Sequence, residues 1–172
     1  MRKPKVVVIG AGSFFFGRPV IWNMVTSPVL RRGTLALVDT NKEVLDTMMT
    51  LARKAIDASG APVALEGSTD RSEVLKDADF VVLTFSENNS RYRGMDCAVS
   101  LNQGVRMCSG DTIGPGGIFR ALREIPRALE MSRDVERLAP EAWVINFVNP
   151  STVLGIALMR YANVRSFAIC DG

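Results

Sequence analysis

The fold of this chain follows from Lys5-Val6-Val7-Val8-Ile9-Gly10-Ala11-Gly12-Ser13, near its start. The run of valine and isoleucine is typical of a strand that is buried on both faces of a parallel sheet. Glycines follow at once, and residues 14–26 have the pattern of a helix that ends before Pro28. A turn of this kind leaves backbone N–H groups at the start of a helix, where a phosphate binds well. These residues therefore predict a strand–turn–helix unit that holds a dinucleotide.

The remaining residues repeat this alternation of strand and helix. Further strands are expected at residues 34–39, 62–65, 79–85, 143–148 and 164–170. Further helices are expected at residues 41–59, 72–76, 94–102, 118–138 and 151–161. Such alternation indicates βαβ units with right-handed crossovers. Residues 1–172 are therefore predicted to form one dinucleotide-binding domain of Rossmann type, a doubly wound α/β fold with six parallel strands in the order 3-2-1-4-5-6.

The composition excludes several classes of function. The net charge is +3 and the basic residues are scattered, so the sequence has no nucleic-acid footprint. No apolar stretch reaches the roughly 18 residues that a membrane-spanning helix needs. Three widely spaced cysteines argue against a disulfide framework and favour a reducing, cytoplasmic location. The chain has no histidine, which excludes Ser-His-Asp catalysis and any histidine-containing metal site completed within it.

Two parts of the first half of the chain are candidates for cofactor binding. Gly10, Gly12, Ser13 and Phe14 form the turn and the helix start where a pyrophosphate would lie. Asp39 closes the second predicted strand, where an acidic residue binds a ribose 2′-hydroxyl and favours NAD over NADP. As a strand-end residue, Asp39 has the alternative role of stabilising a turn.

Polar residues follow the later strands, at the edge of the sheet where ligands bind on this fold. They are Arg91, Arg93, Asp111, Thr112, Asn149, Cys170 and Asp171. Each has an ordinary alternative role: the arginines as solvated loop charges, Asn149 as a turn residue before Pro150, and Cys170 as a buried strand cysteine. Together they predict a rim of carboxylate, amide, thiol and guanidinium groups that binds a substrate.

Gly110-Asp111-Thr112-Ile113-Gly114-Pro115-Gly116-Gly117 is a glycine-rich loop that leads into the long predicted helix. Glycine allows the backbone to approach a ligand closely. Because the turn at residues 10–13 already accounts for the cofactor phosphates, the loop is interpreted as part of the substrate site, with Asp111 as its functional group. In the helix that follows, the amphipathic pattern places four residues on one apolar stripe: Ile118, Leu122, Ile125 and Leu129.

Several motifs of the chain resemble those of glycoside hydrolase family 4, the NAD- and metal-dependent glycosidases. The matching pieces are Val8-Ile9-Gly10-Ala11-Gly12-Ser13, Gly110-Asp111-Thr112-Ile113-Gly114-Pro115-Gly116-Gly117-Ile118, Pro140-Glu141-Ala142-Trp143-Val144-Ile145-Asn146-Phe147-Val148-Asn149-Pro150 and Ile169-Cys170-Asp171. The resemblance covers the whole chain. Its most specific part is the combination of the glycine-rich loop with the Asn-Pro pair.

The resemblance implies a role for each candidate residue. The cofactor end of the sheet would bind NAD, and Arg93 and Asn149 would bind the sugar. Cys170 would be one ligand of a divalent metal, typically Mn²⁺, and Asp171 would match the general acid of α-glycosidase members. Asp111 would raise the basicity of a catalytic tyrosine.

The implied reaction is the hydrolysis of O-glycosidic bonds, with α-glycosides as the expected substrates. It proceeds by NAD-dependent oxidation at C3 of the sugar, metal-assisted removal of the C2 proton, and elimination. Family members are longer, so the resemblance implies that this chain lacks a C-terminal substrate domain, with a histidine metal ligand and the tyrosine base beyond residue 172. It also implies a homo-oligomer. Two other functions stay open: a lactate- or malate-type 2-hydroxy acid dehydrogenase, and an NAD-binding module without catalysis.

Overall fold

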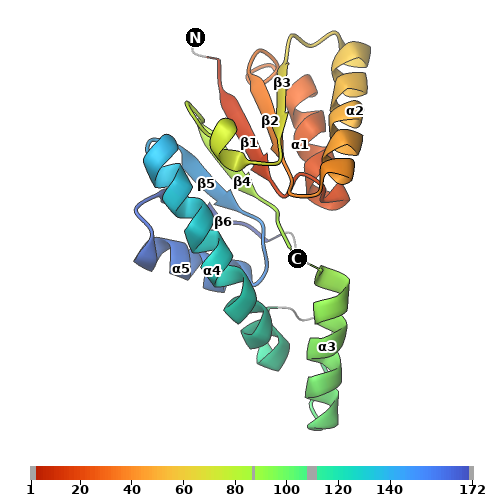
Figure 1. Cartoon of the computed structure of the whole chain (residues 1–172), viewed down its shortest axis with the longest axis vertical. Helices are drawn as coiled ribbons and strands as arrows, with labels where there is room; N and C mark the ends of the chain where they lie inside the picture. The colour runs from red at the N-terminus through yellow and green to blue at the C-terminus, as the bar shows by residue number, and fades with distance from the viewer. Residues whose placement is uncertain (1–2, 87, 108–111, 171–172) are drawn as a thin grey trace.

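The structure, a computed structural model, describes residues 3–86, 88–107 and 112–170. Six parallel strands form one sheet in the order β3-β2-β1-β4-β5-β6 (Figure 1). The strands are β1 Lys5–Ile9, β2 Thr34–Val38, β3 Ala64–Ser68, β4 Phe80–Leu83, β5 Trp143–Asn146 and β6 Arg165–Ala168. Every neighbouring pair is parallel. The predicted doubly wound fold and its strand order are confirmed.

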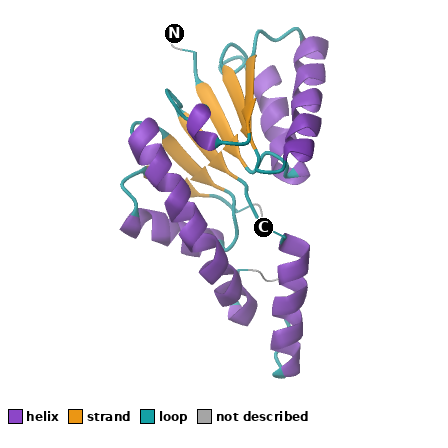
Figure 2. Ribbon diagram, in the orientation of Figure 1, coloured by secondary structure: helices purple, strands orange, loops and turns teal. Residues whose placement is uncertain are grey.

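Helices cover both faces of the sheet (Figure 2). They are α1 Phe14–Thr26, α2 Lys42–Ser59, α3 Asn89–Asn102, α4 Gly114–Leu138, α5 Ser151–Tyr161 and the short 3₁₀ helix η1 Arg71–Glu73. On β1, Val6 and Val8 pack with α1 and α2, while Val7 and Ile9 pack with α4, α5 and the residues after η1. Successive side chains of a strand point to opposite faces, so an unbroken apolar run is what a sheet covered on both sides requires.

Several element boundaries differ from those expected from the sequence, among them those of β3, α3 and α4. β3 lies at residues 64–68 instead of 62–65, because its pairing with β2 (Leu35↔Leu65, Val38↔Ser68) includes the polar end of the strand. α3 begins at Asn89 instead of residue 94, in a polar segment without apolar periodicity. α4 begins at Gly114, so part of the glycine-rich loop is the first turn of a helix in which Pro115 takes an early position that suits proline.

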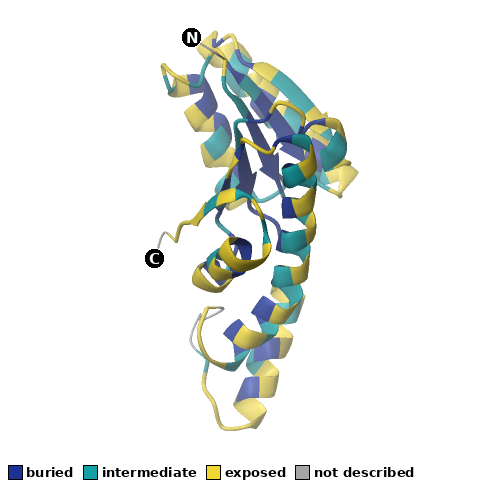
Figure 3. Cartoon of the chain, turned by 90° about the vertical axis from the view of Figure 1, so that its left-hand side faces the viewer, coloured by how far each residue is buried: buried dark blue, intermediate teal, exposed yellow. Residues whose placement is uncertain are grey.

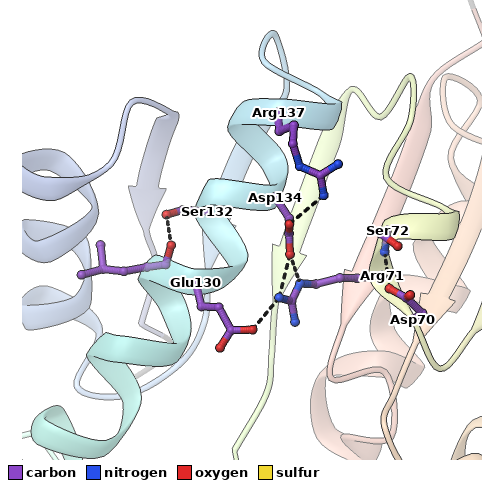
Figure 4. A network of polar contacts seen from close by, with 8 residues as sticks. Asp70, Arg71, Ser72, Glu130, Ser132, Asp134 and Arg137 are labelled. Carbon is purple, nitrogen blue, oxygen red and sulfur yellow. Dashed lines mark hydrogen bonds and ion pairs between the residues drawn. The ribbon is translucent and has the colours of Figure 1, made fainter.

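An ionic cluster joins η1 to α4 on one face of the sheet (Figure 4). Arg71 donates from Nε to Asp134 and from Nη2 to Glu130, both at 2.7 Å. Asp134 also accepts a hydrogen bond from Arg137 at 3.0 Å. The cluster ties the first half of the chain to the second half.

The α3–α4 hairpin extends beyond the carboxyl ends of the strands (Figure 3). α3 leads away from the sheet and α4 returns to it, with Arg123 of α4 bound to Asp96 of α3 at 3.1 and 2.6 Å. Among residues 3–86, 88–107 and 112–170, no helix combines the length and the apolarity needed to cross a membrane.

Replacing Asn41 with alanine should destabilise the fold. The side chain of Asn41 accepts hydrogen bonds from the N–H groups of Glu43 and Val44 and so caps α2. Loss of such a cap costs about 1 kcal/mol of unfolding free energy, or roughly 2–4 °C in Tm for a domain of this size. Thermal unfolding followed by circular dichroism measures the change. Thr47→Ala, in an exposed part of α2, is the control, and an equal loss in that variant would contradict the capping role.

Candidate functional site

Close contacts favour glycine at two positions near the start of α1, one in the turn after β1 and one within the helix. Gly10 has a φ of +88°, and a Cβ placed on it would lie 2.5 Å from the Cα of Phe85 at the end of β4. Gly17 is the third glycine of the motif, two positions later than usual. A Cβ on Gly17 would collide with the carbonyl oxygen of Ala11, so Gly17 allows α1 to pack closely on the turn.

Asp39 holds this turn against the end of β2. Its Oδ2 accepts a hydrogen bond from the N–H of Gly12 at 2.8 Å, and its Oδ1 accepts one from Asn41 at 2.9 Å. A Cβ on Gly12 would lie 2.7 Å from Oδ2, so a glycine at this position lets the carboxylate come this close. Asp39 therefore stabilises the turn, which was the alternative role considered from the sequence, and it also lies in a cavity wall, where its binding of a ribose stays a prediction.

A cavity of about 580 Å³ lies at the carboxyl ends of β1, β2 and β4, with α4 on its far side. Gly10, Gly12, Ser13 and Asp39 line it together. Phe14 is not among the residues that line it; its ring is 58% exposed and lies under the guanidinium of Arg18. The cavity is within the range of volumes usual for ligand sites.

A second cavity, of about 260 Å³, adjoins the first on the side of β5. Five residues line both cavities: Ser13, Thr84, Phe85, Ser86 and Asn89. Asn149, one of the predicted sugar ligands, lines the smaller cavity beside Arg120. The two cavities meet between β1 and β4, where the strand order reverses and where ligands bind in doubly wound folds.

Arg120 and Glu124 are buried charges on α4 that the sequence pattern did not reveal. Their exposed fractions are 7% and 3%, whereas Ile118 and Leu122, which were predicted on the apolar stripe, are 62% and 69% exposed. That prediction was wrong for these two residues because the first half of α4 lies beyond the sheet and faces α3. The apolar periodicity alone cannot show that this turn of the helix faces polar neighbours.

Glu124 lies close to a serine and to three arginines. Its Oε1 accepts a hydrogen bond from Ser86 at 3.3 Å, and its Oε2 lies 3.8 Å from Nη1 of Arg127. Burial raises the pKa of the Glu124 carboxyl, and the positive charges of Arg120 and Arg123 oppose this shift. Burial also lowers the pKa of Arg120, while the Glu124 carboxylate raises it.

The other predicted substrate residues lie outside the two cavity walls or outside the described residues. Arg93, on α3, is half-buried and close enough for its charge to act on Arg120. Residues 112–117 line neither cavity, so the described part of the glycine-rich loop is not the floor of either one. Asp111 and Asp171 lie outside the described residues.

Cys170 is exposed and follows β6, the edge strand. The preceding residue, Ile169, donates its N–H to the carbonyl of Asn146 at 2.9 Å, which holds this segment beside the end of β5. Within the part of the chain that the structure describes, no three histidine, cysteine, aspartate or glutamate side chains form a group able to hold a metal ion. The described residues therefore offer one candidate metal ligand and no complete site.

Comparison with known proteins assigns the chain to a family. The model of the family 4 glycosyl hydrolases matches residues 5–172. A probable 6-phospho-beta-glucosidase from Bacillus subtilis is 37% identical over 163 residues, which cover 94% of this chain and 36% of that relative. The chain thus spans little more than a third of the relative's length.

Two solved structures share the fold over nearly all of this chain. The structure of LplD from Bacillus subtilis has a TM-score of 0.88 at 26% identity, covering 99% of this chain and 38% of that one. A 6-phospho-alpha-glucosidase from gut microorganisms, solved with NAD and Mn²⁺, has a TM-score of 0.84 at 24% identity. The match covers 99% of this chain and 39% of that one. The family match confirms the resemblance seen in the sequence motifs: the chain belongs to the family 4 glycosyl hydrolases.

Proposed function

We propose that this chain carries the NAD-binding part of a glycosidase that hydrolyses O-glycosidic bonds with NAD and a divalent metal. The observation that carries the proposal is the pair of adjoining cavities at the reversal of strand order. One contains Asp39 and the glycine turn, and the other contains Asn149. A cofactor in the first and a sugar in the second would meet at the residues common to both walls.

The described residues fit NAD in the larger cavity. The N–H groups of the first turn of α1, which receives no side-chain cap from Ser13, suit a pyrophosphate, and the fixed carboxylate of Asp39 suits a ribose 2′-hydroxyl. The chemistry that a bound NAD supplies is the reversible oxidation of a sugar hydroxyl. The protein's own contribution is to orient the sugar beside the cofactor, with Asn149 as a hydrogen-bonding group in the smaller cavity.

A divalent metal is part of the proposed function on two grounds: a protein of the same fold that was solved with Mn²⁺, and one candidate ligand in this chain. A 6-phospho-alpha-glucosidase of the same fold was solved with Mn²⁺, and Cys170 is the candidate ligand here. The described residues do not complete a metal site, so the support that they give to a metal is limited to the Cys170 thiol. Asp111 as the group that acts on a tyrosine base, and Asp171 as the acid, stay predictions from the family.

The finer points of substrate choice stay predictions as well. The relatives include a 6-phospho-beta-glucosidase and a 6-phospho-alpha-glucosidase, so the expected preference for α-glycosides rests on Asp171 alone. A homo-oligomer and a cytoplasmic location also stay predictions. The family match favours the glycosidase over the 2-hydroxy acid dehydrogenase.

The full-length protein should hydrolyse nitrophenyl glycosides only when NAD⁺, Mn²⁺ and a reductant are all present. Release of nitrophenol, measured with each component omitted in turn, tests this expectation. Turnover that is independent of NAD⁺ would overturn the proposed function. Binding of NAD without any turnover on a range of glycosides would instead favour the binding module.

Asp39→Asn should weaken NAD binding and shift the preference towards NADP. The substitution keeps the shape of the side chain but removes the charge that accepts a ribose hydroxyl and repels a 2′-phosphate. Loss of a charged hydrogen bond predicts about a ten-fold increase in the Kd for NAD, measured by calorimetry. Asp46→Asn, which removes a charge paired with Lys42 on the outer face of α2, is the control. Unchanged NAD affinity in Asp39→Asn would show that Asp39 does not bind the cofactor.

Asp111→Ala and Cys170→Ser should abolish turnover of the full-length protein and leave the Kd for NAD nearly unchanged. Both residues are assigned to the sugar and metal end, away from the turn that binds the cofactor. Cys97→Ser, at a half-buried position on α3, is the control and should retain turnover. A large loss of NAD affinity in either test variant would contradict these assignments.

A further inference from the structure

Glu124 is a buried carboxylate beside both cavities to which the proposed function assigns no part. Its exposed fraction is 3%, and it is not among the described residues that line either cavity. Its neighbours do line them: Arg127 lies in the wall of the larger cavity, and Ser86 lies in the walls of both. Glu124 therefore lies one residue behind the place where the two cavities meet.

Ser86 connects this carboxylate to the cavities. It is an exposed residue that follows β4, and its hydroxyl donates to Oε1 of Glu124 at 3.3 Å. A serine hydroxyl has one proton to donate and two lone pairs that accept. With the proton directed to Glu124, the Oγ atom of Ser86 offers the cavities lone pairs alone.

The charges around Glu124 determine the direction of this hydrogen bond. Three guanidinium groups of its own helix act on it: Arg120, Arg123 and Arg127. Two charged residues of α3 act in turn on Arg120: Arg93 and Asp96. Guanidinium groups donate and do not accept, so a protonated Glu124 would donate its proton to the Oγ atom of Ser86 and turn the serine proton towards the cavities.

We propose that Glu124 is a positioning residue, which makes Ser86 accept a hydrogen bond from an N–H or O–H group of a ligand where the two cavities meet. Two groups would supply such a donor at this place: the carboxamide of the nicotinamide of NAD, and a hydroxyl of the sugar. This inference rests on the proposed glycosidase function, and it adds a residue that acts on the ligand through another residue.

The first experiment identifies the donor with Ser86→Ala in the full-length protein. Calorimetry measures the Kd of NAD and of ADP-ribose, which lacks the nicotinamide, and kinetics measure the KM of a nitrophenyl glycoside at saturating NAD. Ser86→Ala should raise the ratio of the NAD Kd to the ADP-ribose Kd, or the KM of the glycoside, by about 3- to 10-fold. A change in the ratio identifies the carboxamide, and a change in KM identifies the sugar hydroxyl.

The second experiment tests whether Glu124 acts through Ser86. Glu124→Gln keeps the shape of the side chain, and its amide nitrogen should donate to Ser86 while its carbonyl oxygen faces Arg127. It should therefore raise the same quantity as Ser86→Ala by a similar factor. The double variant should lose no more than Ser86→Ala alone, because both changes remove one interaction. Additive losses would mean that the charge of Glu124 acts on the ligand directly, and would overturn the proposal.

The dependence on pH gives an independent measurement. Burial raises the pKa of the Glu124 carboxyl, so the group gains a proton as the pH falls through that raised pKa. In the wild type, the quantity that Ser86→Ala changes should therefore worsen between about pH 8 and about pH 5, and this part of the change should be absent in Ser86→Ala. Because Ser86 is exposed, this comparison decides the question even if Glu124→Gln does not fold.

Asp96→Asn is the matched control. Asp96 is also a buried carboxylate bound to an arginine, Arg123, but it lines neither cavity. Its variant should keep the wild-type ratio of Kd values, the wild-type KM and the wild-type dependence on pH. A change in Asp96→Asn equal to that in Glu124→Gln would show that any buried carboxylate of the hairpin has this effect, and would overturn the proposal.

The outcomes separate this inference from the proposed function. NAD-dependent turnover with both the Kd ratio and the KM unchanged in Ser86→Ala would overturn the role of Glu124 and leave the glycosidase intact. A changed Kd ratio without any turnover would count against the glycosidase and support the role of Glu124. An unchanged ratio without turnover would count against both.

Discussion

The close contact between the β1–α1 turn and the end of β4 governs the geometry of the whole site. The N–H groups of Gly10 and Ala11 both donate to the carbonyl of Val38 at 2.9 Å, and the hydroxyl of Thr84 donates to the carbonyl of Gly10 at 2.9 Å. A side chain at Gly10 would occupy the space of the Phe85 backbone. Glycine at this position therefore lets the ends of β1, β2 and β4 meet, and Thr84 and Phe85 at the end of β4 belong to the wall that the two cavities share.

The same arrangement explains why the carboxylate of Asp39 lies in the wall of the larger cavity. An acidic side chain at the end of β2 can reach solvent or turn inwards, and the hydrogen bonds from Gly12 and Asn41 turn it inwards. Asn41 also caps α2, so the helix cap and the Asp39 carboxylate are positioned by adjacent parts of the backbone. The stability of α2 and the geometry of this cavity wall are therefore coupled at this corner of the sheet.

α4 buries two charged side chains, Arg120 and Glu124, at positions where a helix usually buries apolar side chains. Its second half packs on the sheet through Ala128 and Val135, while Arg120 and Glu124 are buried where the helix passes the strand ends. Burying paired charges costs desolvation energy that their attraction offsets only in part. Burial lowers the pKa of Arg120 and raises that of Glu124, whereas the ion pairs of the cluster in Figure 4 raise the pKa of Arg71 against the effect of its burial.

Local sequence patterns were sufficient to predict the fold class, the strand order and the glycine turn with Asp39. These patterns are the two-sided apolar run of β1, the alternation of strands with helices, and glycine at a position of positive φ. The edge strand β3 and the start of α3 were misplaced, because neighbouring elements set their limits. The tertiary structure was needed to show that Arg120 and Glu124 are buried. It was also needed to show that Ile118 and Leu122 are exposed. Burial along α4 depends on what the helix packs against, and segments distant in sequence supply those neighbours.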